Sequence, residues 1–355
     1  MGEPAGDRTV RALAFHRYSL DRMTQHRRKG SPMDPSERSQ VPAAVLDAFG
    51  LGGGSTQLIE QGNVNRHWRV AQGGRVLVVR RYHSARSARS IMWEHDLMRF
   101  SASKGWPVPA AVVAASGVSL IEHEGRFWSI HPFLEGTSPA DTATARELNG
   151  RWLGQLHRDL EDYPDHNQRP GSGKIWDLDV VAELGCAESW ESLLAMFARD
   201  HSRLADAIRQ QRTRSLDELL RLHYQDLPEQ PIHGDFSLRN LLVRDGSLSG
   251  ALDFDFCRRD ALACDIAPLL MPFQPLDPAL AAALLRGYQS VRPLSGSEWA
   301  LLPALVRAAL LWWVAHLLVR WRLEGGEPAG IARTISQRLP AFDASEPALL
   351  ALRPG

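Results

Sequence analysis

The segment 232–256 constrains this chain more than any other, because polar side chains recur in it around two short apolar runs. Its polar residues of interest are His233, Asp235, Asn240, Asp253 and Asp255. The two apolar runs are joined by Asp245-Gly246, a turn-forming pair that predicts a hairpin. A hairpin of this length returns the chain to its starting point, so we expect the polar residues that flank it to lie close together.

These residue types at these intervals suit the transfer of a phosphoryl group from a nucleotide. Asp235 lies five positions before Asn240, which is the interval in the kinase loop H-R-D-x-x-x-x-N. A carboxylate there accepts the proton of the attacking hydroxyl, while an amide oxygen and a second carboxylate hold Mg²⁺. The sequence thus predicts Asp235 as the base, Asn240 as a catalytic residue and metal ligand, and Asp253 as the main metal ligand. The alternative is a hairpin whose Asp and Asn residues only form turns.

Four further positions of the segment bear on this interpretation. Asp255 follows Asp253 by two residues, so on a strand both side chains would point to one side, and Asp255 is predicted as a further metal ligand. Ser237 stands where kinases carry a Lys and cannot neutralise the transferring phosphoryl group. Arg239 could replace that charge, or it could simply face solvent. His233 has no second histidine at ligand spacing, so we expect it to brace the loop.

Composition excludes several classes of function. Lys+Arg and Asp+Glu both number 41, so nothing predicts a nucleic-acid partner or a charged membrane surface. Cys186, Cys257 and Cys264 lack paired or metal-ligand spacing and fit buried thiols in a reducing cytosol. The N-terminus has no apolar signal segment, and the apolar run 310–319 is too short to span a bilayer. We therefore expect a cytoplasmic protein without a membrane partner, and the sequence does not define its oligomeric state.

The chain divides into an Arg-rich extension, a β-rich part and a helical part. Residues 1–40 show little apolar periodicity and predict a flexible extension, with a basic arm for a partner as the alternative. Residues 41–134 form the predicted N-terminal lobe and residues 135–355 the C-terminal lobe. The predicted strands are 57–61, 67–71, 75–82, 111–115, 118–122 and 127–133. The predicted helices are 42–49, 88–103, 143–158, 178–188, 190–214, 216–222, 278–290, 296–323 and 329–338.

This order of parts resembles the aminoglycoside phosphotransferase and choline kinase group of small-molecule kinases, and the homoserine kinase type II branch is nearest. The resemblance covers about residues 45–325. It rests on short motifs in the same order at 62–70, 78–82, 91–94, 105–109, 132–136, 153–157, 232–243 and 253–254. It implies an α+β, protein-kinase-like fold of two lobes. The N-terminal lobe would hold an antiparallel β-sheet with one main helix, and the larger C-terminal lobe would be mostly helical.

The resemblance also implies where a nucleotide binds. The turn Gly62-Asn63-Val64-Asn65 would cover the phosphates with backbone N–H groups, although a plain hairpin turn is the alternative. The backbone of residues 130–133, including His131 and Phe133, is expected to bind the adenine. These residues are the expected contacts of the nucleotide.

Arg80 takes the place of the Lys that kinases carry on the third strand. Its planar, permanently charged fork can hold the α- and β-phosphates and also pair with Glu94, on the helix of the small lobe. Arg81 is the competitor for this role.

Two features of the helical part complete the expectations. Asp265 resembles the second Asp of the family, which caps a helix and steadies the loop. Trp312, His316 and Arg320 form a stripe on the last long helix, either as core packing or as contacts to the acceptor.

The sequence therefore predicts an Mg²⁺-dependent phosphotransferase that moves the γ-phosphoryl group of ATP, or GTP, to a hydroxyl of a small molecule. An amino alcohol such as homoserine is the leading acceptor by resemblance, and an aminoglycoside or other antibiotic is the runner-up. A catalytically inactive nucleotide-binding regulatory protein of the same fold is the third reading. Ser237 and the missing strand Lys are its support.

Overall fold

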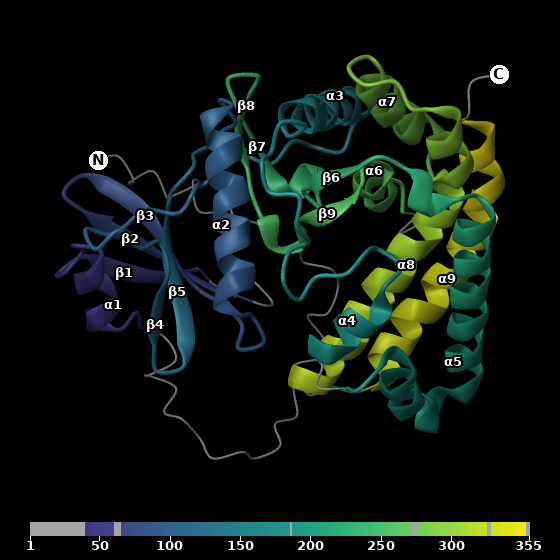
Figure 1. Ribbon diagram of the computed structural model, residues 1–355, viewed down its shortest axis with the longest axis horizontal. Helices are drawn as coiled ribbons and strands as arrows, with labels where there is room; N and C mark the ends of the chain where they lie inside the picture. The colour runs from purple at the N-terminus through teal and green to yellow at the C-terminus, as the bar shows by residue number, and fades with distance from the viewer. Residues whose placement is uncertain (1–39, 60–64, 185–186, 272–275, 325–327, 353–355) are drawn as a thin grey trace, which may run out of the picture. The chain divides into compact units, whose positions relative to one another are not determined.

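The computed structural model describes residues 40–59, 65–184, 187–271, 276–324 and 328–352. They divide into two compact units (Figure 1). The first unit takes in the described residues up to Ala140 together with Leu238–Phe254. The second takes in Asp141–Ser237 and the described residues from Asp255 onward. The predicted lobe boundary at residue 134 did not foresee that the hairpin segment groups with the first unit. The predicted extension 1–40 lies almost wholly outside the described residues.

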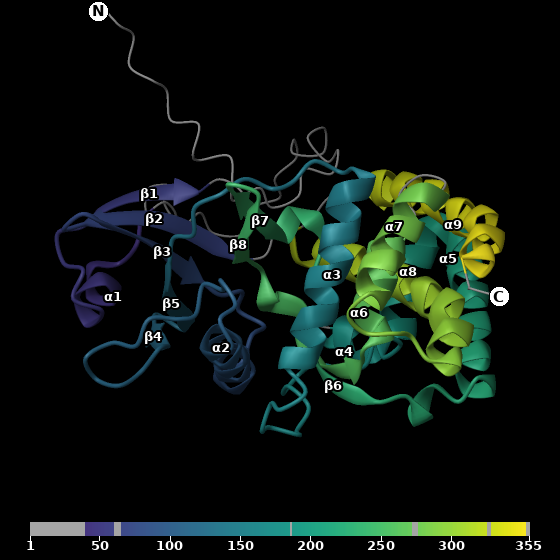
Figure 2. The same ribbon diagram turned by 90° about the horizontal axis from the view of Figure 1, so that it is seen from above.

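A five-stranded antiparallel sheet with the order β1-β2-β3-β5-β4 forms the body of the first unit (Figure 2). Its strands are β1 (Ser55–Ile59), β2 (Arg66–Gln72), β3 (Arg75–Arg81), β4 (Ile121–His123) and β5 (Arg126–Pro132). The prediction of a strand at 111–115 is wrong. The chain turns back after this segment, and the Ala114 N–H donates to the Val118 carbonyl across the turn at 2.8 Å.

The two faces of this sheet carry different side chains. Trp68, Val79 and Ile130 lie in a hydrophobic core with residues of α1 (Ala43–Ala48). Because successive strand residues alternate between faces, Arg80 of β3 points the other way, toward α2 (Ala88–Ser103). The helix begins where it was predicted to begin, since the Ser87 hydroxyl accepts from the Ser90 N–H at 3.2 Å and caps it.

The predicted hairpin of segment 232–256 is present in the first unit as β7 (Leu241–Arg244) and β8 (Ser247–Ala251). Its turn residues Asp245 and Gly246 have φ angles of +52° and +77°, as a two-residue hairpin turn requires. The hairpin is anchored at its end, where the Ala251 N–H donates to the Pro107 carbonyl at 2.8 Å.

Helices dominate the second unit. They are α3 (Ala143–Asp159), α4 (Leu178–Leu184), α5 (Trp190–Arg221), α6 (Ala263–Leu270), α7 (Pro278–Gln289), α8 (Gly296–Glu324) and α9 (Pro328–Ala351). The short strands β6 (Glu229–Ile232) and β9 (Arg258–Ala261) pair antiparallel. The antiparallel sheet in one unit and the helices in the other confirm the predicted α+β class.

Three helix predictions need correction. The predicted helices 190–214 and 216–222 have no break between them at residue 215, and α5 is instead kinked at His201, where the backbone is non-helical. The last helix was predicted to end near residue 338, yet α9 continues to Ala351 through two prolines. Proline disfavours a helix interior, but α9 packs along α8 and α5, and this packing holds it helical. The short helix α6 was not predicted.

The apolar helix α8 is the central helix of the second unit and packs against α4, α5, α6 and α9 (Figure 1). By length and composition its Gly296–Arg322 stretch could cross a membrane, so the argument that the run is too short is wrong. However, 83% of its most apolar window is buried inside the structure. The burial agrees with the predicted core helix, because a helix that is apolar all round needs neighbours on every side.

Glycines allow α3 and α7 to approach closely. A Cβ atom at Gly150 of α3 would lie inside 3.0 Å of the Leu284 carbonyl oxygen. A Cβ atom at Gly287 of α7 would lie inside 3.0 Å of the Glu147 carbonyl oxygen. Both obstacles are helix backbone, which cannot move aside as a flexible side chain can.

The substitution Gly287→Ala should therefore destabilise the protein by about 3 kcal/mol, because the added methyl group overpacks the α3–α7 contact. In an open helix the same change would stabilise by up to about 1 kcal/mol. The free energy of unfolding from urea titration measures the effect. Gly296→Ala is the matched control, since no atom lies within 4 Å of a Cβ at that site. Equal stability of the two variants would contradict the close contact.

Candidate functional site

Asn240 and Asp253 lie together at the end of the hairpin in the first unit, as predicted. The Leu252 N–H donates to the Asn240 carbonyl oxygen at 2.7 Å and fixes the two chain segments side by side. Asn240 is buried at the end of the short 3₁₀ turn Leu238–Asn240. Asp253 has a φ of +63°, a left-handed backbone that is strained for a residue with a side chain. Strain of this kind concentrates at functional sites.

Asp255 does not share a strand with Asp253, so the argument that placed both side chains on one side is wrong. The strand β8 ends at Ala251, and residues Phe254–Phe256 form a 3₁₀ turn. A short helical turn does not alternate its side chains as a strand does. Asp255 belongs to the second unit, where its backbone carbonyl accepts from Arg169 Nη1 at 2.9 Å. A metal-binding role for Asp255 stays a prediction.

A single buried carboxylate holds the loop of residues 233–235 in the second unit. Asp265 accepts from the His233 N–H at 2.8 Å and from the Gly234 N–H at 2.6 Å. His157 Nε2 lies 3.1 Å from the same carboxylate. Burial alone would raise the pKa of Asp265, but the hydrogen bond from His157 and the nearby histidines lower it below its usual value. The carboxylate is therefore ionised and binds the loop backbone.

The predicted role of Asp265 is half right. It steadies the loop, as expected. It does not cap a helix, because α6 begins after Leu262 without a side-chain cap, and Asp265 lies inside its first turn.

Gly234 and His233 fix the conformation of the loop from the other side. Gly234 has a φ of +86°, and a Cβ atom there would lie inside 3.0 Å of the Phe256 carbonyl oxygen. Only glycine meets both conditions. The buried His233 ring lies edge-on to Phe236 with centroids 5.3 Å apart, and its Nδ1 accepts from the Asp235 N–H at 3.3 Å. His233 therefore braces the loop, as predicted.

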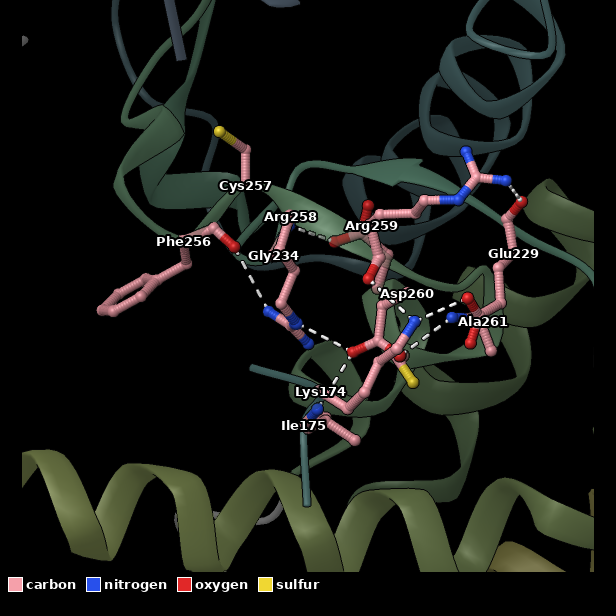
Figure 3. Close-up of polar contacts among 12 residues, drawn as sticks. Lys174, Ile175, Glu229, Gly234, Phe256, Cys257, Arg258, Arg259, Asp260 and Ala261 are labelled. Atoms are coloured by element: carbon pink, nitrogen blue, oxygen red, sulfur yellow. Dashed lines mark hydrogen bonds and ion pairs between the residues drawn. The ribbon is translucent and has the colours of Figure 1, made fainter. Parts of the chain in front are cut away.

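A buried ion pair next to this loop was missed by the sequence analysis (Figure 3). Arg258 Nε lies 2.8 Å from Asp260 Oδ2, and both side chains are at most 2% exposed. Arg258 Nη1 also donates at 3.2 Å to the Phe256 carbonyl, against which Gly234 packs. Burial disfavours the charge of Arg258, but the neighbouring Asp260 raises its pKa. The only sequence signal was charge at alternate positions of a short strand, Arg258 and Asp260.

The stripe on α8 packs against the same segment. The guanidinium carbon of Arg258 lies 5.2 Å from the Trp312 ring centroid, and the His316 ring lies edge-on to Phe256 at 5.0 Å. Trp312 and His316 are only partly buried. The packing interpretation is thus supported for both residues, while contact with the acceptor stays a prediction.

In the first unit, the predicted pair of Arg80 and Glu94 forms. Arg80 Nη1 lies 2.8 Å from Glu94 Oε1, and the two side chains are 8% and 0% exposed. Arg81 lies on the other face of the sheet, with its guanidinium carbon 5.7 Å from the Trp68 ring centroid and 5.6 Å from that of Trp128. The geometry therefore favours Arg80 over Arg81 for a role beside Glu94.

The predicted phosphate-covering turn is described only at its last residue, since Gly62, Asn63 and Val64 lie outside the described residues. Asn65 is buried, and its Oδ1 accepts from the His83 N–H at 3.0 Å. This contact ties the start of β2 to the chain that follows β3.

The segment predicted to bind adenine is partly engaged in the sheet. The Ile130 carbonyl accepts from the Val112 N–H at 2.7 Å, and the Phe133 N–H donates to the Val76 carbonyl at 3.3 Å. The His131 side chain is buried, and its Nδ1 lies 2.7 Å from the Pro109 carbonyl. Adenine contacts of His131 and Phe133 therefore stay a prediction, and they would have to use other backbone groups.

The residues of the hairpin end fit magnesium. Within the described ranges, no group of three or more His, Cys, Asp or Glu could hold a metal ion unaided. Mg²⁺ is usually held by one or two carboxylates and by phosphate oxygens of the substrate, rather than by a full cage of protein ligands. The carboxylate of Asp253 and the amide oxygen of Asn240 supply the hard oxygen ligands that such a site needs.

The stability of the first unit should depend on pH through His131. Burial, together with His95 and Arg80, lowers the pKa of His131 to about 3. In the unfolded chain a histidine has a pKa near 6.5, so between pH 6.5 and 3 only the unfolded state binds the proton. The free energy of unfolding should therefore fall by about 2 kcal/mol between pH 7 and pH 5 on account of this residue.

Urea titrations at a series of pH values measure this decline. His131→Gln should lack it, whereas His166→Gln, at an exposed histidine, should keep it. An H131Q profile parallel to that of the wild type would show that His131 does not contribute.

Known proteins resemble the chain in sequence and in fold. Residues 55–303 match the phosphotransferase enzyme family. A homoserine kinase of Methylobacterium radiotolerans is 31% identical over 292 residues, which cover 79% of this chain and 85% of that protein. An aminoglycoside phosphotransferase of Alicyclobacillus acidocaldarius superposes with a TM-score of 0.63 at 17% identity, covering 92% of this chain and 97% of that one. A microcompartment-associated aminopropanol kinase gives a TM-score of 0.61 at 18% identity, covering 87% and 97%.

These matches confirm the predicted protein-kinase-like fold and the predicted class of enzyme, a small-molecule kinase. The chain belongs to the phosphotransferase enzyme family.

Proposed function

We propose that this enzyme transfers the γ-phosphoryl group of ATP to the hydroxyl of an amino alcohol, with homoserine as the first candidate. The supporting observation is the placement of Asn240 and strained Asp253 side by side, with Asp235 five residues upstream on a loop fixed by Asp265. The relative from M. radiotolerans, a homoserine kinase, supports the choice of acceptor. The fold shared with an aminopropanol kinase is compatible with an amino alcohol.

In the proposed reaction, Asp235 accepts the proton of the acceptor hydroxyl and orients its oxygen toward the γ-phosphorus. The new bond forms between that oxygen and the γ-phosphorus, the bond from the γ-phosphorus to the β–γ bridging oxygen breaks, and ADP leaves. Asn240 and Asp253 would hold Mg²⁺, which, when bound, would offset the charge on the β- and γ-phosphates. Arg80, held by Glu94, would bind the α- and β-phosphates as a fork.

The alternatives rest on narrower observations. The Ser237 hydroxyl is buried without a hydrogen-bond partner among the described residues, and it carries no charge for the phosphoryl group. This favours a slow or inactive enzyme. The aminoglycoside phosphotransferase that shares the fold keeps an antibiotic among the acceptors to be tested.

We also propose that the enzyme works in the cytoplasm on a small molecule, with no nucleic-acid or membrane partner. The burial of α8 and the buried thiol of Cys264 support a reducing, aqueous location.

An acceptor panel tests the proposed reaction. ADP release should be fastest, as kcat/KM, with L-homoserine and weaker with other amino alcohols, sugars and aminoglycosides, with ATP and GTP each tried as the donor. A preference for an aminoglycoside would replace homoserine as the acceptor. Tight nucleotide binding with no turnover on any acceptor would establish the inactive reading.

Asp235→Asn should lower kcat by about 10²- to 10⁴-fold, because the amide cannot accept the hydroxyl proton. The KM for ATP should change less than about threefold, since Asp235 is not assigned to the nucleotide. Asp226→Asn, at an exposed aspartate of the same unit, is the control for a lost surface charge. Turnover of D235N within a few-fold of wild type would remove Asp235 from the role of base.

A further inference from the structure

We propose that Tyr82 is a positioning residue that holds Arg80 in place for the nucleotide, and that a buried chain of hydrogen bonds fixes Tyr82 in turn. The inference rests on the proposed function, in which Arg80 binds phosphates. Arg80 is restrained from two directions. Its Nη1 lies 2.8 Å from Glu94 Oε1, and its guanidinium carbon lies 4.5 Å from the centroid of the Tyr82 ring.

The two restraints act differently. Glu94 holds one nitrogen of the guanidinium through an ion pair. The Tyr82 ring lies against the guanidinium, and this cation–π contact restrains the group from a second side. A guanidinium binds two phosphate oxygens at once only in a set orientation, so the contact with the ring adds to the restraint that the ion pair provides.

Hydrogen bonds to its hydroxyl group hold the Tyr82 ring in place. Its hydroxyl lies 2.8 Å from His95 Nε2 on α2 and 3.2 Å from Ser129 Oγ on β5. Ser129 Oγ lies 2.7 Å from His131 Nε2, and His131 Nδ1 lies 2.7 Å from the Pro109 carbonyl. On the other side, His95 Nδ1 lies 2.9 Å from Ser119 Oγ. The hydrogen bonds thus join the residue after β3 to α2, β5 and the segment after α2.

The donor at the Pro109 end of this network follows from the chemistry of the carbonyl group. A carbonyl oxygen can only accept, so His131 Nδ1 carries a proton and donates to Pro109. In neutral His131 the Nε2 atom then accepts from the Ser129 hydroxyl. A buried hydrogen-bonded network of this kind is rigid. Tyr82, His95, Ser129 and His131 are all at most 5% exposed.

The network is separate from the main hydrophobic core of the sheet. The hydrophobic core with Trp68, Val79 and Ile130 lies on the other face. Apolar side chains could fill the space between β5 and α2 without burying five polar groups, and buried polar groups stabilise less than well-packed apolar ones. The network is instead placed where it fixes the ring under Arg80.

Tyr82→Phe tests the proposal, because it keeps the ring and removes only the hydroxyl. We expect the KM for MgATP, and the Kd for the fluorescent probe mant-ADP, to rise about fivefold, with kcat within about twofold of wild type. This split follows because a phosphate contact made equally in the ground state and the transition state affects KM and not kcat. Ser129→Ala, which cuts the chain one bond further away, should shift both constants in the same direction by less.

Tyr163→Phe is the matched control, a buried tyrosine of the second unit, and its KM for MgATP should equal that of wild type. A merely structural Tyr82 would give Y82F a lower melting temperature and less active enzyme with an unchanged KM, which would overturn the proposal. If Y82F does not fold, the KM of S129A decides in the same way.

Arg80→Gln, measured in parallel, distinguishes a failure of the Arg80 phosphate contact from a failure of the positioning role of Tyr82. If R80Q leaves the KM for MgATP unchanged, the phosphate contact of the proposed function is wrong. If R80Q raises it at least tenfold while Y82F and S129A do not, only the positioning role of Tyr82 fails.

Discussion

The ionised carboxylate of Asp265 is the interaction on which the loop of residues 233–235 depends. A buried charge without partners would be strongly destabilising, so the folded state keeps it only if its hydrogen bonds form. Two backbone N–H groups of the loop and the His157 ring supply them. The carboxylate therefore ties together a helix, a loop and a second helix, and the position of the candidate base follows from the packing of the helical unit.

Glycine contacts between α3 and α7 make that arrangement possible. Gly150 lies two turns before His157 on α3, and Gly287 immediately precedes Tyr288 on α7. Because the helix backbones approach closely at these glycines, the Tyr288 hydroxyl reaches His157 Nδ1 at 2.8 Å. Tyr288 thereby orients the ring whose other nitrogen contacts Asp265. The lack of a side chain at Gly150 and Gly287 thus lets the helices approach, and this approach sets the hydrogen bond between Tyr288 and His157.

Local patterns predicted the parts of the fold that local forces determine. Alternation in 75–82 predicted β3, apolar residues at helical spacing in 88–103 predicted α2, and Asp245-Gly246 predicted the hairpin. The prediction failed where tertiary packing overrides local preference, as in α9, which runs on through its prolines. It also misjudged segment 253–256, where a strand was assumed and a 3₁₀ turn is present. Contacts such as His157 with Asp265, over 100 residues apart, leave no mark in a local pattern.

The backbone of Asp253 has a consequence for how this chain tolerates change. A φ of +63° suits glycine best, so replacing Asp253 by Gly would relax the chain at that point while deleting the carboxylate. Selection for thermal robustness alone would therefore drive this position away from the acid. The proposed metal-binding role of Asp253 would oppose that change, whereas random libraries screened only for folding should drift toward glycine at residue 253.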